Sequence, residues 1–133
     1  MSFGGKPTQN NQNTEIKTAG YPALSTSEFR KLRRIPFVFD EQSLAMAIEI
    51  SACEVQRQLP LNFSVCSKVS LYKRAVYSLA HADLLPEFTT QAMRDAGENV
   101  AEDATVTGDR FRAQSTRDIH QLLGRSSNKV ELI

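Results

Sequence analysis

The clearest hydrophobic pattern in the chain follows Asp40. Apolar residues recur there at steps of four, four, three and four, and they are Leu44, Ile48, Ala52, Val55 and Leu59. Steps of three and four residues place side chains on one face of an α-helix. Asp40 can cap the N-terminus of such a helix, and Pro60 cannot continue it. The pattern therefore predicts a helix over residues 40–59.

Shorter apolar patterns predict three further helices, at residues 26–34, 68–85 and 100–123. Ser25 and Glu28 have the spacing of a capping box, which marks the start of the first of these helices. Four helices joined by short segments predict an all-α fold, a small bundle of about four helices.

Prolines and a glycine mark the expected ends of these helices. Pro36 is expected to stop the first helix, and Pro86 to interrupt the helix that begins near residue 68. Proline has this effect because it lacks a backbone N–H and clashes with the preceding turn. Gly124 is expected to end the last helix in the left-handed conformation, which glycine adopts at least steric cost.

Residues 1–24 differ in composition from the helical region. They are rich in Asn, Gln and Gly and offer little apolar surface to offset the entropy of ordering, so a flexible N-terminal arm is predicted. Alternatively, the arm orders on a neighbouring subunit through its apolar side chains, which are Phe3, Ile16, Tyr21 and Leu24. The expected organisation is this arm, a helical adaptor domain over residues 25–124, and an extended C-terminal tail over residues 125–133.

Composition narrows the functional classes. The chain of 133 residues suits one domain, and its 16 Lys+Arg and 15 Asp+Glu leave a net charge of +1. That balance argues against a nucleic-acid binder held by bulk charge. No apolar run approaches the roughly 20 residues that span a bilayer, and residues 1–20 lack the apolar stretch of a secretory signal. A soluble, intracellular protein without membrane contact is therefore expected.

The sequence carries no recognisable catalytic or metal-binding motif. Cys53 and Cys66 have no zinc-ligand spacing and are predicted to be reduced and buried, like small hydrophobic residues. His81 and His120 have no cysteine or carboxylate at ligand spacing. A Cys–His nucleophile pair is formally possible but has no local support. No catalytic, cofactor-binding or metal-binding residue is predicted, and an enzyme is the weakest class of interpretation.

One dense group of basic residues, called here the basic cluster, lies in the first predicted helix: Arg30, Lys31, Arg33 and Arg34. We interpret it as a contact to DNA phosphates or to an acidic partner surface, and the alternative is a solvated helix face. Arg74 lies inside an otherwise apolar helix, so it is predicted to form an ion pair between helices.

The order of motifs along the chain resembles one known family. Residues 71–85 read Leu-Tyr-Lys-Arg-Ala-Val-Tyr-Ser-Leu-Ala-His-Ala-Asp-Leu-Leu. This stretch resembles the Tyr-x-Arg-Ala-Val helix of the head completion, or head stabilisation, proteins of contractile-tailed temperate bacteriophages. The helix at 40–59 is similar to that family's upstream helix. Residues 111–123 followed by Gly124 and a final Val-x-x-Ile are similar to its C-terminal end, so the resemblance covers residues 25–133.

The resemblance implies a structural virion protein without a catalytic centre or cofactor. Such proteins are similar to helical head–tail connector adaptors that form a ring on the portal after DNA packaging, seal the vertex and offer a surface to the tail. The implied partners are the portal protein, tail-joining proteins, further copies of the chain and packaged-DNA phosphates. The implied locations are the bacterial host cytoplasm during assembly and the head–tail vertex of the virion.

The charge is uneven along the chain, which suits self-association. Residues 1–74 carry ten Lys+Arg and six Asp+Glu, a net +4, whereas residues 75–133 carry six and nine, a net −3. A basic half that meets the acidic half of a neighbour would favour head-to-tail contacts, which can close into a ring. The alternative is a chance distribution over two solvated faces.

The end of the tail is apolar, and five residues form a candidate portal or subunit contact: Lys129, Val130, Glu131, Leu132 and Ile133. In an extended segment, Val130 and Leu132 project to one side, where they can enter a partner's pockets. We therefore expect this segment to dock on the portal or a neighbouring subunit. The alternative is that it folds back on its own helices.

A rival function from another class is a small helical DNA-binding regulator that uses the helices at 26–34 and 40–59. It is disfavoured because the second helix carries apolar and acidic residues and few basic or amide side chains suited to base edges.

Overall fold

The computed structural model describes residues 13–60, 68–96 and 101–124. Its elements in chain order are β1 (Glu15–Ile16), β2 (Leu24–Ser25), α1 (Thr26–Arg33), α2 (Glu41–Arg57), α3 (Val69–Ala96) and α4 (Ala101–Leu122). The predicted all-α class is confirmed, with the addition of one short antiparallel strand pair in which Ile16 lies opposite Leu24. Among the described residues, no helix is both long and apolar enough to cross a bilayer.

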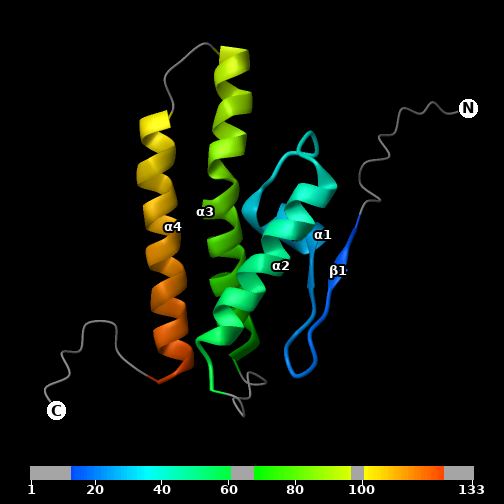
Figure 1. Cartoon of the computed structure of the whole chain (residues 1–133), viewed down its shortest axis with the longest axis vertical. Helices are drawn as coiled ribbons and strands as arrows, with labels where there is room; N and C mark the ends of the chain where they lie inside the picture. The colour runs from blue at the N-terminus through cyan, green and yellow to red at the C-terminus, as the bar shows by residue number, and fades with distance from the viewer. Residues whose placement is uncertain (1–12, 61–67, 97–100, 125–133) are drawn as a thin grey trace, which may run out of the picture.

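The helices form a frame around α3. Figure 1 shows α4 running antiparallel beside α3, while α2 crosses α3 and β1 lies at the edge away from α4. The core lies where these elements meet, and its buried side chains include Leu44, Ile48, Val55, Tyr72, Val76 and Ile119. Leu44, Ile48 and Val55 belong to the predicted stripe after Asp40, so its inward orientation is confirmed; on α3, Leu79 is only partly buried.

Both predicted N-terminal caps form. The Asp40 carboxylate accepts a hydrogen bond from the Ser43 backbone N–H at 2.9 Å, which satisfies one of the free donors at the start of α2. The Ser25 hydroxyl accepts from the Glu28 N–H at 3.0 Å at the start of α1. The local sequence therefore determines where these two helices begin.

Arg34 ends α1 in an uncommon way. It adopts the left-handed conformation, with φ of 56°, and so turns the chain out of the helix two residues before Pro36. The next residue, Ile35, donates its N–H to the Arg30 carbonyl at 2.9 Å. Residues other than glycine are uncommon in this region, because Cβ crowds the backbone there.

The prediction that Pro86 interrupts the third helix is wrong, because α3 continues through it to Ala96. Proline removes only one helical hydrogen bond, the one to the Ala82 carbonyl. At this point α4 packs close alongside, since a Cβ placed on buried Gly108 would lie 4.0 Å from the Ala82 oxygen. Packing against a neighbouring helix therefore outweighs the local preference to stop.

Side-chain contacts fix α4 against α3. The Ser115 hydroxyl donates to the Ala75 carbonyl at 2.9 Å, and Arg74 donates two hydrogen bonds of 2.9 Å to the fully buried Asp118. The predicted interhelical ion pair of Arg74 is thus confirmed. The helix ends as predicted at Gly124, whose φ is 78° and whose N–H donates to the Gln121 carbonyl at 3.1 Å.

The predicted N-terminal arm divides into two parts. Residues 1–12 lie outside the described residues, but residues 13–24 are ordered, which corrects the expected boundary at residue 24. Ile16, Tyr21 and Leu24 pack against the core of their own chain, and the Tyr21 and Tyr72 rings stack with centroids 5.5 Å apart. A few well-placed apolar side chains in a polar segment are sufficient to anchor it.

Candidate interaction surfaces

The basic cluster does not form one surface, because Arg30 faces inward. Its side chain is only 4% exposed, and its guanidinium donates to the carbonyls of Pro36 at 2.8 Å and Phe39 at 2.9 Å. It also forms an ion pair with Glu41 at 3.3 Å. The predicted contact of Arg30 with DNA or an acidic partner is therefore wrong, since this side chain closes the turn between α1 and α2.

Arg33 is also engaged within the chain. Its Nε donates to the Nδ1 of His81 at 3.0 Å, and its guanidinium carbon lies 4.6 Å from the centre of the Phe111 ring. Burial, and to a lesser degree the nearby charge of Arg74, lowers the pKa of Arg33. Arg33 therefore joins α1 to α3 and α4. Of the basic cluster, Lys31 and Arg34 are the fully exposed members.

His81 lies among aromatic rings from three helices. The rings of Phe29, Phe88 and Phe111 lie with centroids 6.1, 6.0 and 4.6 Å from the imidazole. Burial, together with the charge of Arg33, lowers the pKa of His81 to about 4. The ring is therefore neutral at pH 7 and accepts a hydrogen bond from Arg33, a structural role rather than that of a proton carrier.

Glu41 connects the strand pair to the helices. Its carboxylate accepts hydrogen bonds from the hydroxyls of Thr14 at 2.7 Å and Thr26 at 2.5 Å, in addition to the ion pair with Arg30. Burial alone would raise the pKa of Glu41, but these hydrogen bonds and the Arg30 charge hold it below its ordinary value. The network fixes residues 13–26 against the start of α2.

A second network surrounds Glu28 and borders a groove. The Tyr77 hydroxyl accepts from the Ser25 N–H at 3.1 Å and donates to the Glu28 carboxylate at 2.7 Å, while Lys73 pairs with Glu28 at 2.9 Å. Burial and the bond to Glu28 raise the pKa of Tyr77. The groove has a cavity volume of about 380 Å³ between α1 and α3, and Glu28, Lys73 and Tyr77 form part of its wall together with Leu32. Lys73 in this wall is paired with Glu28, so the groove is a recess of mixed apolar and polar character.

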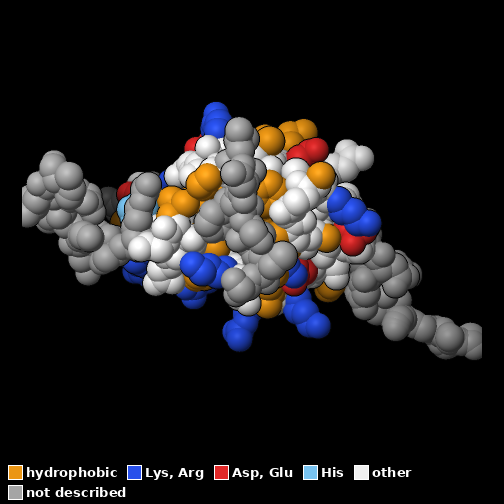
Figure 2. All heavy atoms as spheres, turned by 90° about the horizontal axis from the view of Figure 1, so that it is seen from below, with side chains coloured by type: hydrophobic (Ala, Val, Ile, Leu, Met, Phe, Trp, Pro, Cys, Tyr) orange, Lys and Arg blue, Asp and Glu red, His pale blue; other side chains and the backbone are white. Residues whose placement is uncertain are grey.

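Large hydrophobic side chains are exposed in three regions that the apolar stripes do not include. The first, at the end of α1, contains Leu32, Phe37 and Val38; the second contains Met46 and Ile50 on α2; and the third contains Val106 on α4. Seen from the lower end of the bundle, hydrophobic side chains reach the surface between projecting Lys and Arg side chains (Figure 2). Met46 and Ile50 are four residues apart on the face opposite the predicted stripe, which is the sequence signal that could have identified them.

Cys53 belongs to this second region. It is an exposed free thiol, so the prediction that it is buried is wrong, because its position on α2 faces away from α3; Cys66 lies outside the described residues. In residues 13–60, 68–96 and 101–124, no group of three or more His, Cys, Asp and Glu could hold a metal ion. The middle of the exposed face of α2 is acidic and apolar, with Gln42 and Arg57 only near its two ends, so it offers few side chains suited to the edges of DNA bases.

The remaining predicted contact, the five residues of the tail from Lys129 to Ile133, lies outside the described residues. The last described residue before it is Gly124, which follows the end of α4 at Leu122. Lys68 donates to the carbonyls of Gln121 and Leu122 at 3.5 and 3.4 Å, and so fixes the C-terminal end of α4.

Comparison with known proteins identifies the family. Residues 64–133, just over half of the chain, match the model of the phage head completion protein (GPL) family. The probable head completion/stabilization protein of Haemophilus phage HP1 (strain HP1c1) is 27% identical over 152 residues, an alignment that covers 98% of this chain and 99% of that protein. No solved structure matches the chain. The matched residues include α3, α4 and the rest of the chain after them, and the chain belongs to the phage head completion protein family.

Proposed function

We propose that this protein binds the portal vertex of the phage head after DNA packaging, seals it, and prepares it for joining to the tail. The protein joins the head in the bacterial host cytoplasm, and its final position is the head–tail vertex of the virion. Its partners are the portal protein and tail-joining proteins, and copies of the chain form a ring. The observation that carries it is the family match, which runs from residue 64 through α3 and α4 to the last residue.

The tail provides the most direct contact in this proposal. Val130 and Leu132 are apolar side chains that share one side of an extended segment, and such a segment can add to a partner's sheet edge or enter its pockets. Buried contacts fix α4 to α3, which supports the proposal by giving the helix that precedes the tail a defined position. We therefore assign the segment from Lys129 to Ile133 to docking on the portal or a neighbouring subunit.

Deletion of residues 129–133 tests this assignment. Thermal stability should stay nearly unchanged, while attachment to portal-bearing, DNA-filled heads should be lost. A matched pair sharpens the test: Val130→Asn with Leu132→Asn should abolish attachment, whereas Glu131→Gln should not. A large loss of stability on deletion would support folding back on the bundle, and normal attachment of the deleted chain would refute tail docking.

The two exposed members of the basic cluster, Lys31 and Arg34, remain candidates for contact with DNA phosphates or an acidic portal surface. Exposed charges act over roughly 10 Å at 0.1 M salt, so their contribution should be salt-dependent. The double variant Lys31→Gln, Arg34→Gln should lower DNA retention and reduce its dependence on salt. Lys17→Gln, another exposed lysine, is the control. If the wild-type chain, the double variant and the control retain DNA equally well, Lys31 and Arg34 form only a solvated helix face.

A further inference from the structure

The outer face of α2 carries an apolar row that nothing in the described chain covers. Met46 is 61% exposed, Ile50 is 58% exposed, and Cys53 follows three residues later. We call these three residues the α2 stripe. Glu49 lies beside it, exposed and without an ion-pair partner among the described residues. Arg57, four residues beyond Cys53, is also exposed, but it is paired with Glu54, so the unpaired charge at the margin of the stripe is that of Glu49.

The outer face of α4 carries a row with the same spacing and the opposite charge. Val106, 57% exposed, is followed at steps of four, three and four by Arg110, Ala113 and Arg117, all exposed. We call these four residues the α4 stripe. Arg110 has no ion-pair partner within the described part of the chain. Apolar or small side chains therefore alternate here with free positive charge.

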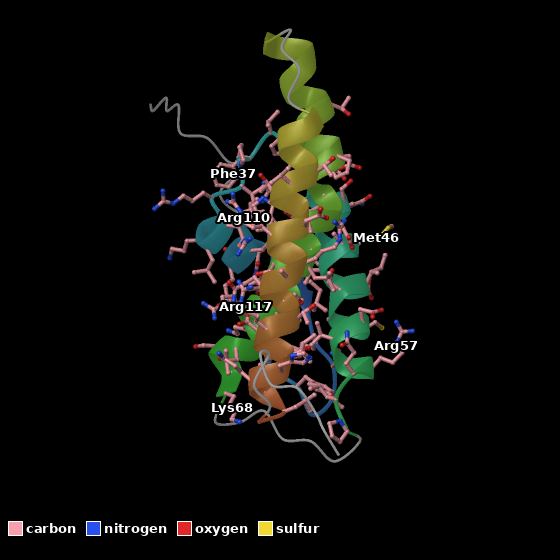
Figure 3. All side chains as sticks on the ribbon, turned by 90° about the vertical axis from the view of Figure 1, so that its left-hand side faces the viewer. Phe37, Met46, Arg57, Lys68, Arg110 and Arg117 are labelled. Atoms are coloured by element: carbon pink, nitrogen blue, oxygen red, sulfur yellow. The ribbon has the colours of Figure 1, made fainter. Side chains whose placement is uncertain are left out.

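The two stripes cannot meet within one molecule. Figure 3 shows Met46 and Arg57 projecting from α2 at one edge, while Arg110 and Arg117 lie on α4 away from that edge. The buried faces of both helices are occupied by α3. Arg117 donates a hydrogen bond to the Gln114 Oε1 at 3.0 Å, so Arg110 carries the guanidinium without a partner among the described residues. The unpaired carboxylate of Glu49 and the unpaired guanidinium of Arg110 have opposite charges, and both rows remain exposed on an isolated chain.

We propose that the α2 stripe of one copy docks on the α4 stripe of a second copy. The binding partner is a second copy because every chain carries both stripes. One type of contact, repeated from copy to copy, then covers every α2 stripe and every α4 stripe. Two different surfaces make the contact heterologous, the type that closes into a ring when the rotation between copies fits. The inference rests on the proposed function and names the surfaces of its ring.

The local charges at this contact run opposite to the charge of the two chain halves. The first half of the chain is net basic, yet it contributes Glu49, and the net acidic second half contributes Arg110. The proposed contact is still head-to-tail, as the uneven charge suggested, but the sign of the charge on each surface depends on the side chains that α2 and α4 expose. The net charge of a chain half does not predict that sign, because it also counts residues that are paired or that lie on other faces.

Charge reversal tests the pairing. Glu49→Arg and Arg110→Glu should each weaken self-association of the full chain at least about tenfold, measured by analytical ultracentrifugation at low salt, and the double variant should largely restore it. Glu87→Arg reverses an exposed charge on α3 outside both stripes and should have little effect. Unchanged association in both single variants, or no restoration in the double variant, would overturn the proposal.

The native thiol of Cys53 provides a second, independent test. In a Cys66→Ser background, Ala113→Cys should give chains linked between positions 53 and 113 by a short bismaleimide, as identified by peptide mass spectrometry. Ser27→Cys on α1 is the control and should give no links to Cys53. Links between two Cys53 residues would show that α2 meets α2, and exclusive links from Cys53 to the portal would show that another protein covers the stripe; either would overturn the proposal.

The same measurements on portal-bearing heads separate this inference from the proposed function. If the wild-type chain binds these heads but shows neither the charge dependence nor the link, the inference is wrong and the portal function stands. If the wild-type chain does not bind them, the portal function is wrong. In that case linking and association of the purified chain in solution still decide whether the two stripes meet.

Discussion

Arg30 and Lys31 are adjacent in the chain but have opposite environments. Arg30 is buried and bonded to two carbonyls and to Glu41, whereas Lys31 is exposed beside it. A buried ion pair adds little net stability compared with an apolar pair, but removing one partner leaves the other charge uncompensated. Equal substitutions at the two positions should therefore have very different consequences.

Arg30→Gln should lower the free energy of unfolding by about 3–5 kcal/mol, because Glu41 would remain without its cationic partner. Lys31→Gln should change it by less than about 0.5 kcal/mol. Urea unfolding followed by circular dichroism measures both. Neutralising the whole basic cluster is consequently not a test of surface contact alone, since it would also destabilise the fold. A similar small loss in the two variants would show that the Arg30 network contributes little.

His81 should make stability depend on pH. Its pKa is about 4 in the folded chain and near 6.5 when unfolded, so between these values the unfolded state binds more protons. Its contribution is therefore complete above pH 6.5 and is lost as the pH falls toward 4. His81→Gln keeps a hydrogen-bond acceptor and should flatten the dependence between pH 5 and 6.5, where Glu41 stays ionised. An unchanged slope in this range would contradict the assignment.

At the scale of elements, α3 and α4 each contain one residue that disfavours a helix, and packing between the two helices stabilises both. Pro86 removes a helical hydrogen bond from α3, and Gly108 lowers the intrinsic helix preference of α4. Gly108 lies against the turn of α3 that precedes Pro86, beside Ala82 and Leu85. Each helix is therefore regular through a residue that would weaken it in isolation.

Alanine substitutions of Gly108, inside α4, and of Gly124, just after it, should change the stability of the fold in opposite directions. A Cβ at Gly108 would meet the flexible end of Arg112 at 3.4 Å and Leu85 at 3.7 Å, which are ordinary contacts, so Gly108→Ala should stabilise by about 0.5–1 kcal/mol. Gly124→Ala should destabilise by about 1–2 kcal/mol, because φ there is 78°. Thermal unfolding compares the two variants. Loss of stability in Gly108→Ala would indicate a tighter crossing of α3 and α4.

The helices were predictable from sequence because their signals are local. The caps of Ser25 and Asp40 and the stop at Gly124 depend on residues within one turn. The continuation through Pro86, and the inward orientation of Arg30, depend on residues from other elements, so no local pattern could indicate them. The exposed residues Glu49 and Arg110 were visible as charged residues, but only the packing shows that no neighbour in the described part of the chain neutralises them.

At the scale of the whole molecule, Tyr77 joins distant parts of the chain. Its hydroxyl stands between the Ser25 N–H and the Glu28 carboxylate, 52 and 49 residues away, and so replaces the direct bond between these two groups that would complete the capping box. Tyr77→Phe should destabilise by about 1 kcal/mol, because two partly buried polar groups would lose a hydrogen-bond partner. Tyr21→Phe is the matched control, since the Tyr21 hydroxyl makes no hydrogen bond among the described residues. Equal stability of the two variants would show that water replaces the Tyr77 hydroxyl.

The distance between Ser25 and Tyr77 also has a consequence during protein synthesis. At about 5–20 residues per second, the ribosome adds the intervening 52 residues in about 3–10 s. During that time α1, with only eight residues, is too short to persist unaided. Nascent chains arrested before residue 77 should therefore leave the Ser25 amide open to hydrogen exchange, whereas chains extended beyond α4 should protect it. The hydrogen bond that joins the start of α1 to α3 can thus form only after more than half of the chain has been translated.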